Sequence, residues 1–286
     1  MRYERPRTIE DASELLASAE ARSFVLAGGT DLLVRMQSDE FEADLIVDIK
    51  AIDGIDAIVE TSDGFVIGAA VPAAALSEDA GLVATWPGVV EAANLIGSTQ
   101  IQGRCTIVGN LCNASPAADS VPALVAADAR VRVVGPSGTR ELAVLDVPTG
   151  PGRTSLAKGE VIDAVLLPKR PARSADAYLR FIPRTEMDIA VVGVGVNLTL
   201  DANGVISDAR VALGAVAPTV ILVPEAAQAL IGTKADETAL DALAAACSDA
   251  SNPIDDKRGT VAFRKQVAGV LARRATQAAY SRAGEN

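Results

Sequence analysis

The stretch best suited to bind a ligand runs from Val25 to Val34, with the sequence V-L-A-G-G-T-D-L-L-V. Apolar residues up to Ala27 predict a buried strand, two glycines break it, and Thr30 and Asp31 precede an apolar run that can begin a helix. Such a turn exposes backbone N–H groups. These groups and the dipole of the following helix both favour a bound phosphate. The Asp31 carboxylate opposes an anion, and an ordinary strand-to-helix turn is the alternative interpretation.

A second polar stretch runs from Thr106 to Asp119, with the sequence T-I-V-G-N-L-C-N-A-S-P-A-A-D. It combines hydroxyl, amide and carboxylate side chains with a glycine, a set that can hold a polyhydroxylated, phosphorylated ligand at several points. The longer segment 98–119 has no clear period, which predicts a long functional loop. Asn and Ser side chains that only cap turns are the alternative.

A third glycine-bearing stretch, Gly193–Leu198, reads G-V-G-V-N-L. It fails as a dinucleotide fingerprint, because Leu198 occupies the third glycine position and the stretch lies within a predicted strand. Close packing beneath helices explains its small residues better.

Composition limits the chemistry that the chain can carry. Its 286 residues suffice for two domains, and 49% apolar with 3% aromatic residues suits a globular mixed helix and sheet protein. The net charge of −11 disfavours nucleic acid and anionic membranes as partners.

The chain has no histidine, so Ser-His-Asp and Cys-His catalysis and histidine zinc sites are excluded. We expect no metal site, since three cysteines fall short of the usual four cluster ligands. We also expect a cytoplasmic protein without signal peptide or membrane span.

Local patterns predict an α+β fold. A helix over 8–19 precedes the first glycine turn, and a strand over 43–49 follows it. Hairpins are expected around residues 62–64 and 135–138, helices over 73–79, 87–96 and 121–126, and a strand over 161–167. Strands over 177–182, 189–200 and 205–216 and helices over 224–230, 238–247 and 261–280 complete the chain. We therefore expect domains 1–172, with subdomains of about 1–54 and 55–172, and 173–286, the last a three-stranded antiparallel sheet with helices.

Taken together, the first two stretches resemble the FAD-binding medium subunit of molybdenum hydroxylases, the family of carbon monoxide dehydrogenase medium subunits and xanthine dehydrogenase flavin domains. F-I-P-R-T-E-M-D-I-A (Phe181–Ala190), A-R-V-A-L-G-A-V-A-P-T (Ala209–Thr219) and the Arg258–Arg264 segment agree with that family. The resemblance covers nearly the whole chain in order. It implies a PCMH-type FAD-binding domain of two subdomains, followed by a C-terminal domain.

The same resemblance implies where FAD binds. The first stretch would wrap the diphosphate, the second would form the opposite wall, and a segment with Arg184, Glu186 and Asp188 would pass close to the isoalloxazine. Two departures stand out. Val108 takes the place of a usual glycine, and Ile182 takes the place of a lysine, for which Arg180 is a candidate substitute. The cofactor-binding residues expected on this basis are Val25, Leu26, Ala27, Gly28, Gly29, Thr30, Asp31, Leu32, Ile96, Ile101, Thr106, Gly109, Asn110, Ser115, Asp119, Ile162, Arg180 and Arg184.

A flavin would supply the redox chemistry, so no catalytic side chain is expected in this chain. The resemblance further implies that molybdopterin and 2Fe-2S clusters lie on a large and a small partner subunit, in a dimer of heterotrimers. The chain would pass electrons from the iron–sulfur subunit to an external acceptor. Two other functions stay open: a self-contained FAD-dependent oxidoreductase, and an assembly module without cofactor.

Overall fold

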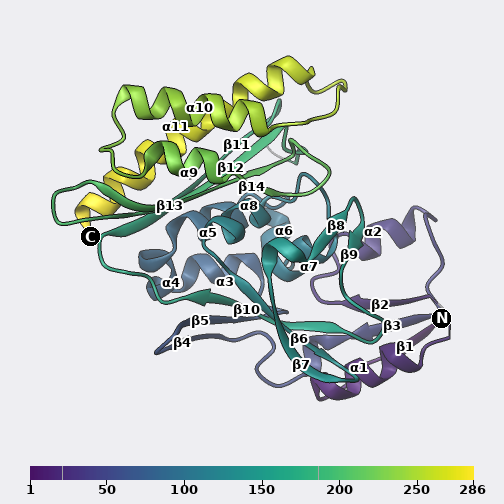
Figure 1. Ribbon diagram of the computed structural model, residues 1–286. Coiled ribbons are helices and arrows are strands. Elements are labelled where there is room, and N and C mark those ends of the chain that lie inside the picture. The colour runs from purple at the N-terminus through teal and green to yellow at the C-terminus, as the bar shows by residue number, and fades with distance from the viewer. Residues whose placement is uncertain (21, 186) are drawn as a thin grey trace.

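The computed structural model describes residues 1–20, 22–185 and 187–286 (Figure 1). Parallel and antiparallel strands form separate sheets that pack against helices, which confirms the α+β class. Buried apolar residues form two large clusters, one built largely from residues 12–167 and one from residues 175–283. No helix in the described part of the chain has both the length and the apolar character to cross a membrane.

The N-terminal part is a small parallel sheet flanked by helices. Its elements are β1 (Arg2–Glu4), α1 (Ile9–Ser18), β2 (Ser23–Leu26), α2 (Leu32–Gln37), β3 (Leu45–Asp48) and the 3-10 turn η1 (Ile49–Ala51). The strand order is β1-β3-β2. Thr8 caps α1, because its Oγ1 accepts a hydrogen bond of 3.1 Å from the Asp11 N–H. The predicted strand, glycine turn and helix are confirmed. The prediction that this strand is buried is wrong, because β2 is an edge strand of the sheet and its Val25 is 36% exposed. Strand β1 was not predicted, since three residues are too few to show a period.

The central part is an antiparallel sheet with strand order β4-β5-β10-β6-β7. Its strands are β4 (Ile58–Thr61), β5 (Gly64–Gly68), β6 (Arg130–Gly135), β7 (Gly138–Ala143) and β10 (Val161–Pro168), and a short hairpin is formed by β8 (Pro148–Gly150) and β9 (Arg153–Thr154) after the 3-10 turn η2 (Val144–Asp146). Both predicted hairpins are confirmed. Strand β10 pairs with β5 and β6, so it joins the two hairpins at the middle of the sheet.

The helices of the central part are short. They are α3 (Ala73–Glu78), α4 (Ala80–Thr85), α5 (Pro87–Ala93), α6 (Thr99–Gln102), α7 (Ile107–Cys112) and α8 (Ser120–Ala126). The prediction of a long loop over 98–119 is therefore wrong, since α6 and α7 lie inside it. Thr106 caps α7 by accepting a hydrogen bond of 2.9 Å from the Gly109 N–H, and Ile107 and Leu111 anchor the helix in the core. A helix of fewer than two turns is too short to reveal its period in the sequence.

The C-terminal sheet has four strands, not the predicted three. They are β11 (Ser174–Phe181), β12 (Val192–Leu200), β13 (Ile206–Gly214) and β14 (Ile221–Leu222). The two residues of β14 pair with the end of β13 but are too few for an alternating pattern. The helices are α9 (Pro224–Leu230), α10 (Glu237–Ala250) and α11 (Val261–Glu285), so α11 extends beyond its predicted end at residue 280.

Figure 1 shows α9, α10 and α11 on one face of the C-terminal sheet and α5 and α8 on the other, with the five-stranded sheet beyond them. Helix α8 comes very close to the sheet. A Cβ at Gly195 would lie 2.5 Å from the Pro122 carbonyl oxygen, and one at Gly214 would lie 2.6 Å from Pro122 Cγ. Gly195 on β12 and Gly214 on β13 thus allow the helix to approach, and Gly195 confirms the packing interpretation of the G-V-G-V-N-L stretch.

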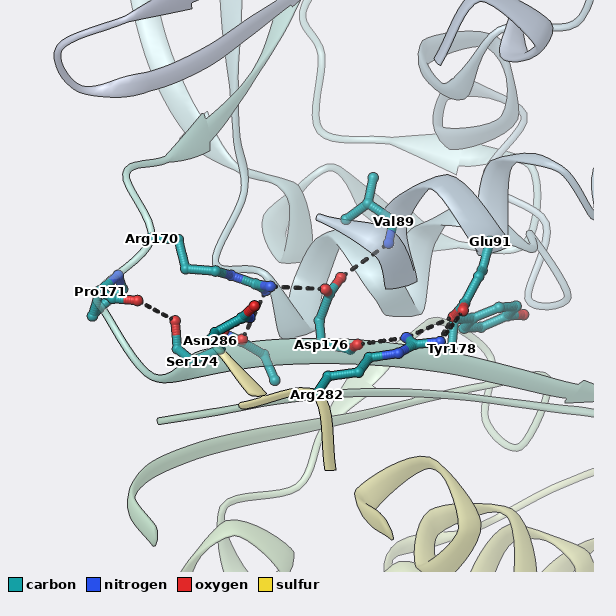
Figure 2. Close-up of polar contacts among 10 residues, drawn as sticks. Val89, Glu91, Arg170, Pro171, Ser174, Asp176, Tyr178, Arg282 and Asn286 are labelled. Carbon is teal, nitrogen blue, oxygen red and sulfur yellow. Dashed lines mark hydrogen bonds and ion pairs between the residues drawn. The ribbon is translucent and has the colours of Figure 1, made fainter. Parts of the chain in front are cut away.

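A buried polar cluster joins α5, β11 and α11 (Figure 2). Asp176 on β11 accepts a hydrogen bond of 3.0 Å from the Val89 N–H and pairs with Arg170 at 3.0 Å. From α11, Arg282 donates to the Asp176 carbonyl at 2.8 Å and pairs with Glu91. Burial raises the pKa of Asp176 and lowers the pKa of Arg170. Each charge of this pair thus depends on the other, because neither is solvated.

Candidate functional site

A cavity of about 510 Å³ opens between the first glycine turn, helix α7 and the segment leading into β10. A volume of this size is in the range of pockets that hold cofactors. Twelve residues predicted from the sequence line it: Val25, Ala27, Gly28, Gly29, Thr30, Asp31, Leu32, Ile96, Thr106, Gly109, Asn110 and Ile162. The two polar stretches, far apart in the sequence, therefore face one cavity.

The glycine turn touches the backbone that leads into α7. A Cβ at Gly28 would lie 2.0 Å from the Arg104 carbonyl oxygen and 3.1 Å from the Cys105 Cα, so only glycine fits there. Gly29 has a different requirement, since its φ of +76° lies in the left-handed region. The first glycine thus permits the close approach, and the second permits the turn.

The cavity wall carries backbone donors that are free to bind a ligand. No N–H of residues 28–32 donates a hydrogen bond to any residue that the structure describes. Within the described chain, the N–H groups of Ile107 and Val108 at the start of α7 also donate no hydrogen bond. The capping Thr106 Oγ1 accepts only from the third N–H of the helix, that of Gly109. The Asn110 Oδ1 accepts a hydrogen bond of 3.1 Å from the Ser120 N–H, which fixes the side-chain amide and leaves its Nδ2 able to donate to a ligand. These groups suit an anion.

Four charged side chains line the cavity: Asp31, Arg35, Lys158 and Glu160. Arg35 and Glu160 already pair with other side chains, at 2.8 Å and 2.7 Å respectively. Lys158 is exposed, and among the described residues it forms no ion pair. It is therefore a cation of the cavity wall that can neutralise a bound anion. Its positive charge also offsets the negative charge of Asp31, which would repel that anion.

Lys158 belongs to a group of lining residues that the sequence did not single out. The Lys158–Gly159 turn is held against α1, because the Ser13 Oγ donates a hydrogen bond of 2.8 Å to the Gly159 carbonyl. The signal in the sequence was the turn K-G-E directly before the predicted strand over 161–167. Two thiols, Cys105 and Cys112, also line the cavity, and burial raises the pKa of each, to about 11 and about 12, so both are protonated at neutral pH.

Two of the predicted residues form a buried ion pair instead of lining the cavity. Arg180 Nη1 lies 2.8 Å from Asp119 Oδ1, and both side chains are largely buried. Burial raises the pKa of Asp119 to about 6, against the opposing influence of Arg180. Tyr178 lies on the same strand as Arg180 and is completely buried, which raises its pKa. Asp119 thus links α8 to β11.

The other predicted residues outside the cavity lining are Leu26, Ile101, Ser115 and Arg184. Leu26 packs with a small apolar cluster under α2, and Ile101 packs against the main core. Ser115 is exposed and accepts a hydrogen bond of 3.3 Å from the N–H of residue 117. Arg184 is also exposed and pairs at 3.2 Å with Asp188. Glu186, expected in the same segment, lies outside the described residues.

Known proteins are similar to this chain over nearly its whole length. A family model described as the FAD binding domain in molybdopterin dehydrogenase matches residues 1–170, and one described as the CO dehydrogenase flavoprotein C-terminal domain matches residues 177–279. The chain is 32% identical over 281 residues to the carbon monoxide dehydrogenase medium chain of Afipia carboxidovorans, covering 98% of this chain and 97% of that one. It is 31% identical over 284 residues to the putative xanthine dehydrogenase FAD-binding subunit of Escherichia coli, covering 99% and 97%.

Solved structures agree with the sequence matches. A chain in the crystal structure of the Cu,Mo-CO dehydrogenase in its cyanide-inactivated form superposes with a TM-score of 0.94 at 32% identity, covering 99% of this chain and 98% of that one. A chain of the carbon monoxide dehydrogenase from Hydrogenophaga pseudoflava superposes with a TM-score of 0.93 at 30% identity, with the same coverage. The likeness includes both parts of the chain.

Proposed function

Because this chain belongs to the family of FAD-binding subunits of molybdenum hydroxylases, we propose that the cavity between the glycine turn and α7 holds its FAD. The chain is an oxidoreductase subunit that carries FAD and transfers electrons. The observation that supports this site best is the contact of Gly28 with the Arg104–Cys105 backbone, which places two sets of free N–H groups on one cavity.

The residues present fit FAD. Free N–H groups of residues 28–32 and of the start of α7 suit the diphosphate, which is the charged centre of the molecule. Lys158 adds a cation, and Asn110 Nδ2 adds a donor for hydroxyl groups. Apolar side chains such as Ile96 and Ile162 line the cavity as well. Bound FAD would supply the electron transfer, and the chain would bind, orient and shield it.

Val108 is compatible with this site, although the resemblance implied a glycine there. Its side chain is 6% exposed and packs in the main core. Helix α7 begins normally at Ile107, since the Thr106 cap is intact. The residue therefore keeps its backbone at the cavity wall while its side chain is accommodated in the core.

We further propose that an iron–sulfur subunit delivers the electrons, that a molybdopterin subunit carries the substrate chemistry, and that the complex is a dimer of heterotrimers. The names of relatives, such as "medium chain", support partner subunits. The thiols support clusters on another chain, because Cys105, Cys112 and Cys247 are three free cysteines and a cluster needs four ligands. Free thiols also support a location in the cytoplasm. We place the domain boundary near residue 172, between the two family matches.

Flavin binding by the full-length chain tests the proposal. We expect the purified chain to bind one FAD per chain, with the absorbance spectrum of a bound flavin. The double variant Thr106→Ala with Asn110→Ala, and Gly29→Val, should retain less FAD while their circular dichroism stays unchanged. A folded chain that stays colourless with added FAD would indicate an assembly module instead.

Co-purification tests the role in electron transfer. Expressed with the genes beside it, the chain should elute with a cluster-bearing and a molybdopterin-bearing subunit, and its flavin should be reduced by substrate only in that complex. Reduction of the isolated holo-chain by an organic substrate would indicate a self-contained oxidoreductase.

A further inference from the structure

The 3-10 turn η1, directly after β3, carries Lys50, a charged residue that does not line the cavity. The Lys50 Nζ donates a hydrogen bond of 3.0 Å to the Ala27 carbonyl oxygen. Ala27 itself lines the cavity, directly before Gly28. Lys50 therefore connects η1 with Ala27, the residue directly before Gly28.

The ammonium group of Lys50 is held in place by Asp48. Its Nζ lies 2.7 Å from Asp48 Oδ1, and this oxygen also accepts a hydrogen bond of 3.0 Å from the Lys50 N–H. The Asp48 side chain is 4% exposed, whereas that of Lys50 is 34% exposed. Although burial raises the pKa of Asp48, the hydrogen bonds from Lys50 and Tyr3 outweigh it and keep the pKa below its ordinary value. The carboxylate is thus ionised at neutral pH.

The other oxygen of this carboxylate is held from the edge of the sheet. The Tyr3 hydroxyl donates a hydrogen bond to Asp48 Oδ2. Tyr3 lies on β1, which pairs with β3 in parallel register, so that Tyr3 is opposite Ile46. The N-terminal strand therefore completes a chain of contacts that runs from Tyr3 through Asp48 and Lys50 to the Ala27 carbonyl.

The planar peptide bond between Ala27 and Gly28 couples this contact to the direction of the Gly28 N–H. No cis peptide bond occurs in the described residues, so the bond between Ala27 and Gly28 is trans and planar. In a trans peptide the C=O and the following N–H point in opposite directions. Because Lys50 holds the Ala27 carbonyl on its own side, the Gly28 N–H is directed away from Lys50. That N–H donates to no described residue and is free for a ligand.

We propose that Lys50 is a positioning residue for the FAD diphosphate, which it orients indirectly by fixing the Ala27–Gly28 peptide plane through the Ala27 carbonyl. The inference rests on the proposed FAD site. Lys50 acts through its hydrogen bond to the Ala27 carbonyl, and its charge is paired with Asp48, which Arg5 also approaches at 3.7 Å. An arginine at this position can donate to the same carbonyl, whereas a methionine fills the space without a donor.

The test measures the dissociation constant of FAD for the full-length chain by fluorescence quenching after removal of bound flavin. We expect Lys50→Met to raise it about tenfold, in keeping with a hydrogen bond to a charged group. Lys50→Arg should stay within about threefold of the wild type, since its guanidinium restores the donor. The matched control is Lys234→Met, an exposed lysine of the C-terminal part that should bind FAD like the wild type.

A second variant keeps the test valid if Lys50→Met does not fold. Tyr3→Phe removes one hydrogen bond at a half-exposed side chain and should raise the dissociation constant about two- to fourfold. Combined with Lys50→Met, it should add less than it does alone, because both act through Asp48.

Equal FAD binding by Lys50→Met and wild type would overturn the inference, as would Lys50→Arg binding as weakly as Lys50→Met. If the wild type binds no FAD at all, it is the proposed function that fails.

Discussion

Gly28→Ala perturbs the contact between the glycine turn and the segment before α7. The added Cβ would lie 2.0 Å from the Arg104 carbonyl oxygen and 2.8 Å from its carbonyl carbon. Both atoms belong to the backbone, so no side chain can rotate away. The turn and the 104–105 segment must separate by more than about 1 Å to restore an ordinary contact.

The expected cost follows from that displacement. Overpacking of this kind costs about 1 to 3 kcal/mol, and this corresponds to a lower melting temperature by about 3 to 10 °C for a domain of this size. FAD binding is expected to weaken as well, because the displaced N–H groups would face the diphosphate at the proposed site. A loss of about 1.5 to 3 kcal/mol of hydrogen-bond energy raises the dissociation constant about 10- to 150-fold.

Two matched glycine variants separate sterics from backbone freedom. Gly103→Ala is the control, since a Cβ there meets no atom within 4 Å and its φ is −70°. Gly29→Ala is strained by its φ of +76°, but its nearest neighbours are flexible leucine side chains. Thermal melts and FAD titrations of the three variants should rank Gly28→Ala as the weakest binder. If Gly28→Ala bound FAD as tightly as Gly103→Ala, the proposed contact would have no part in the site.

The remaining predictions concern the junction between the two parts of the chain. Gly195→Ala should lower the melting temperature, because its Cβ would lie 2.5 Å from the Pro122 carbonyl, at a cost of about 1 to 3 kcal/mol; an unchanged melt would contradict this. Asp176→Asn should destabilise the chain by about 3 kcal/mol in denaturant titrations, since the buried Arg170 loses its counter-charge, and a cost below about 1 kcal/mol would count against the pair. Burial raises the pKa of Asp119 to about 6 from an ordinary 3.8, so the folded chain binds a proton that the unfolded chain releases. The contribution of Asp119 to the free energy of unfolding therefore rises as the pH falls from 7 to 4. Over this range the melting temperature of the wild type should rise relative to that of Asp119→Asn. An equal pH dependence of the two melting temperatures would refute the pKa shift.

Much of the fold could be predicted because the responsible signals are local. The Thr8 cap, the turn glycines and the alternating strands each act over a few residues and gave elements within a few positions of the observed ones. Some short elements were lost, such as β1, β14 and α7, because each has too few residues for a repeating pattern to stand out. They are stabilised by distant partners, as β1 is by β3.

The residues that contribute backbone groups to the site could be predicted from the sequence better than those that contribute charged side chains. Glycines and a Thr cap have a recognisable spacing, and the residues around them do line one cavity. Lys50 carries no such signal, since an isolated lysine resembles any surface lysine, and Lys158 is marked only by the K-G-E turn before β10. The role proposed for Lys50 follows from its position across a parallel strand pair, with Leu26 opposite Asp48. Tertiary structure alone brings that pair together.

The central claim is that residues 25–32 and 104–113 together hold the FAD diphosphate. Hydrogen–deuterium exchange of the full-length chain with and without FAD tests it directly, since the free N–H groups of both segments would become hydrogen-bonded. We predict slower exchange in peptides covering both segments at once and little change in α10 and α11. Protection confined to other regions, or to one segment alone, would contradict the account.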